Sequence, residues 1–177
     1  MAYSDKTLED LFTEYSNLMY RFLLLMVNNR EEAEDLTQEV FIRVQKALPN
    51  FKGESSYKTW LYTIARNLVY DHCRKKKTMN LLKNLARFDR SEPIPQEIIE
   101  MKEQTQLLYK ALLELKLPYR EVIILRKIKG YQISETAEIL GWTDSKVKTT
   151  LHRALHALKN ELMKMGWNND DQVNFIG

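Results

Sequence analysis

Cysteine, glycine and proline are all scarce in this sequence. Its 177 residues include a single cysteine, Cys73, with 5 glycines and 4 prolines. One cysteine excludes an intramolecular disulfide framework and fits a reducing compartment. So little glycine and proline argues against a collagen-like or low-complexity chain, while 44% hydrophobic residues suffice for one core or two small ones.

Long apolar runs are absent as well. The longest extends from Phe22 to Val27 and is far too short to cross a bilayer. The first ten residues, MAYSDKTLED, carry acids where a signal peptide has a basic region and then an apolar one. We therefore expect a soluble, cytoplasmic protein without direct insertion into a membrane.

Charged residues are abundant but unevenly distributed. The net charge is only +3, so it does not by itself indicate a polyanionic partner. Acidic residues are concentrated in residues 31–39, whereas basic residues are concentrated in residues 74–77 and again in residues 146–159. This segregation indicates separate surfaces for separate partners.

Apolar residues recur at steps of three and four along most of the chain, which is the pattern of amphipathic helices. The predicted helices cover about residues 8–26, 30–48, 57–74, 107–115, 119–129, 134–140 and 143–165. Between Thr78 and Gln104 two prolines and many polar residues interrupt the pattern and predict a linker with short helical pieces. We therefore expect an all-α fold of two small helical domains, residues 1–78 and 105–165, joined by a flexible linker, residues 79–104, and followed by a polar tail, residues 166–177.

The second half contains the spacing of a helix-turn-helix. Ala137 is small where two helices would cross, Gly141 allows a left-handed turn, and Val147 would fill the wedge between the helices. Thr143 is the natural N-cap of the second helix, whose first turns would enter a groove of DNA. The candidate phosphate and base contacts on that helix are Lys146, Lys148, Thr149, His152 and Arg153. The alternative is an ordinary solvated helix in a helical hairpin.

Longer stretches resemble a known family. LPYREVIILRKIKGYQISETAEILGWTDSKVKTTLHRALHALKNEL resembles region 4 of bacterial extracytoplasmic-function (ECF) sigma factors, a group of the sigma-70 family. EAEDLTQEVFIRV and FKGESSYKTWLYTIARNLVYDHCRKKK resemble its region 2, the first as the polymerase-binding helix and the second as the segment that reads the minus-10 element. Two departures stand in region 4: Thr136 replaces a usual aliphatic residue, and Lys146 stands where threonine is frequent.

For the first domain, the resemblance implies contacts with the clamp helices of the largest subunit of core RNA polymerase. The residues that match are Asp35, Gln38 and Glu39. Their spacing agrees, because acids and an amide three and four residues apart form one polar ridge that can pair with basic residues. The alternative is a solvated, dipole-favoured first helical turn, a role that suits Glu31 and Glu32.

The resemblance also implies that the first domain binds the minus-10 element. The matching residues are Phe51, Ser55, Ser56, Lys58, Trp60, Arg66, Asn67, Tyr70, Arg74, Lys75 and Lys76. A site for single-stranded DNA requires aromatic side chains on which bases stack, an amide that can read a base edge, and basic residues that contact the phosphates. Two alternatives stay open. Trp60 can be a core residue, and the basic residues 74–77 can interact favourably with the dipole at a helix C-terminus.

Metal and catalytic constellations are not predicted. His152 and His156 are four residues apart, but the sequence offers no third ligand nearby. His72 and Cys73 are adjacent and would point in different directions on a helix. We find no glycine-rich phosphate loop and no nucleophile with a base, so we expect no covalent chemistry, no cofactor and no small-molecule substrate.

The resemblance implies a sigma factor that binds core RNA polymerase, recognises promoter DNA and opens its strands for transcription initiation. It further implies control by an anti-sigma factor, commonly membrane-tethered, and envelope stress as the usual signal. One rival is a conventional helix-turn-helix repressor or activator, which would bind a palindrome as a dimer and leaves the first domain unexplained. Another is an enzyme or a helical protein-binding module, which leaves the second basic surface unexplained.

Overall fold

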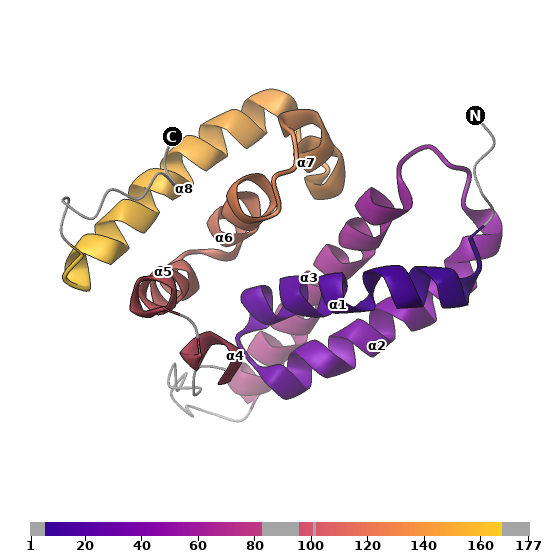
Figure 1. Ribbon diagram of the computed structural model, residues 1–177, viewed down its shortest axis with the longest axis horizontal. Coiled ribbons are helices and arrows are strands. Elements are labelled where there is room, and N and C mark those ends of the chain that lie inside the picture. The colour runs from indigo at the N-terminus through magenta and orange to yellow at the C-terminus, as the bar shows by residue number, and fades with distance from the viewer. Residues whose placement is uncertain (1–5, 83–95, 101, 168–177) are drawn as a thin grey trace. The chain divides into compact units, whose positions relative to one another are not determined.

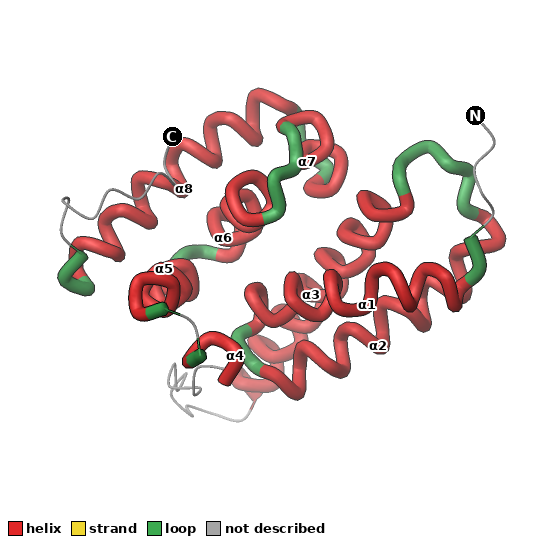
Figure 2. The backbone as a smooth tube through the Cα atoms, viewed as in Figure 1, coloured by secondary structure: helices red, strands yellow, loops and turns green. Residues whose placement is uncertain are grey.

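A computed structural model describes residues 6–82, 96–100 and 102–167 of the chain. Throughout these residues the regular structure is helical, as Figure 2 shows, which confirms the expected all-α class. The described residues form two compact units, residues 6–82 and residues 96–167. Residues 83–95 and 101 of the expected linker, and residues 168–177 of the expected tail, lie outside the described residues.

Three helices build the first unit: α1 (Leu8–Val27), α2 (Arg30–Ala47) and α3 (Tyr57–Leu82), labelled in Figure 1. A 3₁₀ turn, η1 (Leu48–Asn50), follows α2. The short connection between α1 and α2 is made of two asparagines. Asn28 ends α1 in a left-handed conformation, and the Asn29 side chain accepts a hydrogen bond of 2.9 Å from the Glu32 amide to begin α2.

Each helix of the first unit packs against the other two through its apolar face. The Phe22 and Tyr62 rings meet edge to face with their centroids 5.0 Å apart, which joins α1 to α3 in the core. The fully buried side chains around them are Leu11, Met19, Leu23, Ala33, Val40, Val44, Leu61, Ala65 and Val69. Burial leaves the opposite faces of α2 and α3 free for polar side chains.

The predicted end of α3 near Arg74 is wrong, because the helix continues to Leu82. Neither glycine nor proline interrupts residues 57–82, and lysines 75–77 are good helix formers. The Thr78 hydroxyl also donates a hydrogen bond of 3.0 Å to the Arg74 carbonyl. The basic run therefore lies inside the helix and not at its end. An interaction with the dipole of a helix C-terminus thus does not account for these basic residues.

The second unit consists of five helical segments and a preceding short one. These are α4 (Gln96–Ile99), α5 (Glu103–Glu114), α6 (Leu117–Ile123), η2 (Ile124–Ile128), α7 (Ile133–Leu140) and α8 (Asp144–Lys164). The long helix α8 packs against α5, α6 and α7. Its contact face is made of Val147, Ala154, Leu158 and Leu162, all buried.

The helix predicted over residues 119–129 differs in two ways from the structure. It begins two residues earlier, since Pro118 fits a first helical turn, where its missing N–H costs no hydrogen bond. It also widens into a π-helix, η2, in which the Lys129 amide donates to the Ile124 carbonyl, five residues back, at 2.8 Å. Arg120 stabilises the preceding corner by donating to the carbonyls of Leu112 and Leu113.

Candidate polymerase and nucleic-acid interfaces

The turn between α7 and α8 has the predicted helix-turn-helix geometry. Gly141 lies in the left-handed region with φ 64°, where a side chain would be strained. The Thr143 hydroxyl accepts a hydrogen bond of 3.2 Å from the Lys146 amide and caps α8. Ala137 and Val147 are buried between the helices. These local predictions are confirmed.

Thr136, which departs from the family pattern, is fully buried. Its hydroxyl donates a hydrogen bond of 2.8 Å to the carbonyl of Gln132, the N-cap of α7. Burying a hydroxyl costs little free energy when it makes a hydrogen bond, so this departure from the family pattern does not disturb the helix-turn-helix.

The outward face of α8 carries the candidate minus-35 contacts. Lys146, Lys148, Thr149, His152 and Arg153 are all exposed, on the side of the helix away from Val147 and Ala154. Ser145 and His156 are also exposed and lie along the middle of this face, at positions four residues before Thr149 and four after His152. Sequence reasoning missed Ser145, although helical spacing could have found it.

Lys146 has a specific neighbour that sequence reasoning also missed. Its ammonium nitrogen lies 4.6 Å from the centre of the Trp142 ring, within the range of a cation–π interaction. Trp142 itself lies half-buried in the turn, with its amide donating to the Ala137 carbonyl at 2.9 Å.

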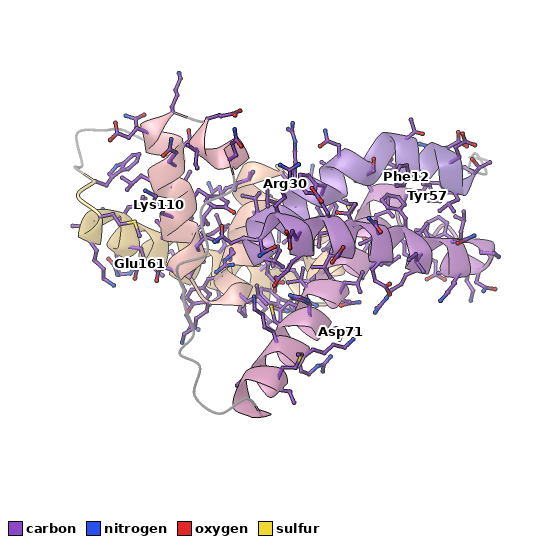
Figure 3. The ribbon with its side chains drawn as sticks, turned by 90° about the horizontal axis from the view of Figure 1, so that it is seen from below. Phe12, Arg30, Tyr57, Asp71, Lys110 and Glu161 are labelled. Carbon is purple, nitrogen blue, oxygen red and sulfur yellow. The ribbon has the colours of Figure 1, made fainter. Side chains whose placement is uncertain are left out.

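Aromatic rings gather at the start of α3 and in the loop before it. Phe51 stacks on Tyr57 and lies against Trp60, with centroid distances of 4.6 Å in both pairs. A hollow opens beside them, lined by Ala47, Asn50, Phe51, Lys52, Glu54, Ser55 and Trp60. Trp60 is partly exposed at this hollow, so it is not a core residue. Tyr57, labelled in Figure 3, was missed, although it stands between the predicted Ser56 and Lys58.

Four candidate minus-10 contacts share one face of α3. Asn67, Tyr70 and Arg74 recur at steps of three and four, and Arg66 lies one turn before Tyr70, with its guanidinium 4.5 Å from the centre of the Tyr70 ring. Asn67 and Arg74 are exposed. An aromatic ring, a guanidinium and an amide on one surface offer stacking, charge and base-edge readout together.

Two of the predicted DNA contacts have structural roles that the sequence did not indicate. The Ser56 hydroxyl accepts a hydrogen bond of 3.1 Å from the Thr59 amide at the start of α3. The Lys76 ammonium donates a hydrogen bond of 2.9 Å to Glu32 on α2. Lys76 therefore lies on the side of α3 that faces α2, whereas Arg74 and Lys75 are exposed.

Glu32 links the two helices through two partners. Its second carboxylate oxygen lies 2.9 Å from His72 Nε2, also on α3. Burial by itself would raise the pKa of Glu32, but the hydrogen bonds from Lys76 and His72 outweigh it and hold that pKa below its usual value. Glu32 thus belongs to the contact between the helices and not to a solvated first turn.

The predicted polymerase ridge lies along α2. Asp35 and Gln38 are exposed, and Glu39 is partly exposed and accepts a hydrogen bond of 3.2 Å from Arg43. Ile42 extends the ridge by one turn, with 45% of its surface exposed, and sequence reasoning missed it because an apolar residue on a helix is expected to be buried.

A chain of charges connects this ridge to the side of α3 that carries the candidate minus-10 contacts. Arg43 Nη1 lies 3.8 Å from Asp71 on α3, and Asp71 accepts a hydrogen bond from Arg74. Asp71, labelled on α3 in Figure 3, is partly exposed. The two candidate surfaces of the first unit are therefore held in a defined relation by side chains of both.

Comparisons with known proteins agree with the division into two parts. The family Sigma-70 region 2 matches residues 11–79, and the family Sigma-70, region 4 matches residues 105–158. The ECF RNA polymerase sigma factor SigX of Bacillus subtilis is 39% identical over 165 residues, which cover 89% of this chain and 84% of that protein. The chain belongs to the ECF sigma factors. It binds core RNA polymerase and promoter DNA, as the proteins of this family do in initiating transcription.

Further relatives support this membership. RNA polymerase sigma factor YlaC of Bacillus subtilis is 35% identical over 89% of this chain and 93% of its own length. Among solved structures, the sigma factor RpoE in complex with the anti-sigma factor NepR from Bartonella quintana matches with a TM-score of 0.75 and 26% identity, over 88% of this chain and 96% of that one. The ECF sigma fold is thus shared across both units.

Among residues 6–82, 96–100 and 102–167, no helix combines the length and apolar character needed to cross a membrane. Within the same ranges, no three His, Cys, Asp or Glu side chains are grouped so that they could hold a metal ion.

Proposed function

We propose that the two units divide the work of a sigma factor between them. Residues 1–78 bind the polymerase clamp and the minus-10 element, and residues 105–165 bind the minus-35 element through α8. Residues 79–104 link these parts, and residues 166–177 form a tail. The protein acts in the cytoplasm and performs no covalent chemistry itself.

One observation carries this proposal furthest. The aromatic hollow at Phe51 and Trp60 adjoins the helix that presents Arg66, Asn67 and Tyr70, and both belong to the unit that carries the acidic ridge. Such a hollow fits a base that has left the stack, because the base can stack on an aromatic ring while a nearby basic group holds its phosphate. A conventional helix-turn-helix regulator has no use for it.

The polymerase contact centres on the exposed ridge of α2. Asp35, Gln38 and Glu39 supply polar and acidic groups for a basic partner surface, and exposed Ile42 supplies apolar area beside them. A stable interface combines an apolar centre with a polar rim, and this ridge offers both. The ridge recruits the first unit to the polymerase and so brings the aromatic hollow to the DNA.

Promoter opening follows from binding energy. α8 docks in duplex DNA with Lys148, Thr149, His152 and Arg153 toward the groove and Lys146 toward a phosphate. Phe51 and Trp60 then hold unstacked bases, while Arg74 and Lys75 hold the adjoining phosphates. A base held by these rings cannot return to its partner in the duplex. Each captured base therefore shifts the equilibrium from closed toward open strands, without any chemical step.

Regulation by an anti-sigma factor is supported by a solved relative. The RpoE protein of Bartonella quintana was solved with the anti-sigma factor NepR bound. We propose that this chain is likewise held inactive by an anti-sigma factor, membrane-tethered as is common in the family, and is released under envelope or other stress. Such a partner would cover the ridge of α2 or the outward face of α8.

The test is transcription in vitro with purified core polymerase, with and without the protein, on a pool of genomic fragments. We expect new start sites that share two spaced upstream motifs, mapped by sequencing. The double variant Asp35→Ala with Gln38→Ala should not produce these start sites, because it should no longer bind core polymerase. An absence of new starts, together with polymerase-independent binding to a palindrome, would instead establish a conventional regulator.

A further inference from the structure

Trp142 and Lys146 form a pair at the entrance of the recognition helix. Trp142 lies in the turn, directly after the left-handed Gly141 and directly before the Thr143 cap. Its amide is bonded to Ala137 at 2.9 Å, so its backbone is fixed on both sides. Lys146 lies one helical turn later, with its ammonium 4.6 Å from the centre of the Trp142 ring.

The position of Lys146 on α8 decides what it can reach. Relative to buried Val147, Ser145 and Thr149 lie along the middle of the outward face, whereas Lys146 lies at one edge, with Arg153 two turns further along that edge. When a helix enters the major groove, its middle faces the bases and its edges face the two phosphate backbones. Lys146 therefore faces a phosphate.

A free lysine would lose much rotamer freedom on binding that phosphate. Lysine is among the side chains with the most rotamer entropy to lose, and Lys146 is exposed, with its ammonium over the ring of half-buried Trp142. The indole face attracts the ammonium and leaves its outer hydrogens available to an anion. An indole fixed by the turn thus restricts Lys146 before DNA arrives.

We propose that Trp142 is a positioning residue for promoter binding: it holds the Lys146 ammonium ready for one phosphate of the minus-35 element. This inference rests on the proposed role of α8. It assigns no base contact to Trp142, whose effect on DNA acts through Lys146.

The experiment uses the full chain assembled with core polymerase and a promoter fragment found by start-site mapping. Affinity is measured over a series of salt concentrations. Trp142→Leu should weaken binding about two- to fivefold, the effect of losing an exposed cation–π contact. Trp142→Phe keeps a ring and should retain most of the affinity. Lys146→Gln should weaken binding more and lower the slope of log K against log salt by about 0.9, because one phosphate contact is lost.

The decisive comparison is the double variant. If Trp142 acts through Lys146, Trp142→Leu should have no further effect in a Lys146→Gln background. Lys159→Gln is the matched control, since Lys159 is another exposed lysine of α8, and Trp142→Leu should keep its full effect there. Thermal unfolding of each variant separates loss of binding from loss of the fold.

Two results would overturn the inference alone. Trp142→Leu could weaken binding equally with and without Lys146, which would indicate a general disturbance of the turn. It could also leave the affinity of the otherwise unchanged protein unaltered. A failure of the unsubstituted holoenzyme to bind any promoter fragment would overturn the proposed function, and this inference with it.

Discussion

The carboxylate of Glu32 accepts a hydrogen bond of 2.9 Å from the ammonium of Lys76, which joins the first turn of α2 to the late part of α3. Their positions are 44 residues apart in the chain. The contact holds α3 against α2 beyond the point where a helix end was expected, while Arg74 and Lys75 stay exposed. The ion pair therefore separates Lys76 from the neighbouring basic residues that face solvent.

Removing this contact should destabilise the first unit. We expect Glu32→Ala to lower the free energy of unfolding by about 1 kcal/mol, because both partners are partly exposed and water screens the pair. Glu31→Ala is the control, since Glu31 is exposed in the same helical turn and should change stability little. Urea unfolding of the full chain, followed by fluorescence and amide exchange in α3, measures the difference. If Glu32→Ala and Glu31→Ala changed the free energy of unfolding equally, the contact of Glu32 with α3 would not stabilise the unit.

The same contact should depend on pH. The pKa of Glu32 is held below its usual value of 4.5 in the folded protein, so the unfolded chain takes up this proton first as the pH falls. The stabilisation is present above pH 4.5 and is lost as the pH falls through the folded pKa. We expect the stability difference between the wild type and Glu32→Gln to shrink as the pH falls below 4.5. A difference that grows in acid would show the opposite sign.

Phe51 should matter for strand opening more than for duplex binding. Phe51→Ala removes the ring that lies against both Tyr57 and Trp60, and we expect promoter opening to fall about tenfold, since stacking is worth about 1–3 kcal/mol per base. Permanganate reactivity of unpaired thymines in the holoenzyme complex measures opening. Binding to a duplex that carries only the minus-35 element should be unchanged. Loss of both activities together would point to unfolding instead.

Ile42 should contribute to polymerase binding. Ile42→Ala removes exposed apolar area beside Gln38, and we expect the affinity for core polymerase to fall about threefold to tenfold. Ile128→Ala is a matched control, because Ile128 is 38% exposed in the other unit. Fluorescence titration of labelled protein with core polymerase distinguishes them. If the two variants bind alike, the ridge ends at Glu39.

Gly141 tests the turn of the helix-turn-helix. Gly141→Ala should destabilise the second unit by about 1–2 kcal/mol, because a φ of 64° is unfavourable for a residue with a Cβ. An added Cβ would meet no atom within 4 Å, so the cost is conformational and not steric. Gly141→Asn should cost less, since asparagine tolerates this region. Thermal unfolding compares the three proteins, and similar losses for Ala and Asn would argue against a backbone effect.

Much of the binding surface was predictable because it depends on local patterns. Asp35 and Gln38 were expected on one ridge, and Lys148, Thr149 and His152 on one face, since helical spacing alone places them there. The structure shows these residues exposed. Their contacts with polymerase and DNA remain predictions. Helical spacing could also have found Ser145, whereas Ile42 was missed because an apolar residue on a helix is expected to be buried, and Tyr57 was missed between the predicted Ser56 and Lys58.

The sequence by itself determined where most helices lie, though not the end of α3 or the π-helix, together with the left-handed turn at Gly141, the Thr143 cap and the family. Periodicity, capping and motif order are local properties of the chain. Only the tertiary structure decided which side chains of the basic run face solvent. Neighbouring lysines on a helix differ by about 100° in direction, and it was the packing of α3 on α2 that turned Lys76 toward Glu32. Packing likewise placed Trp60 at the surface against Phe51, because the loop between η1 and α3 folds back over the start of α3.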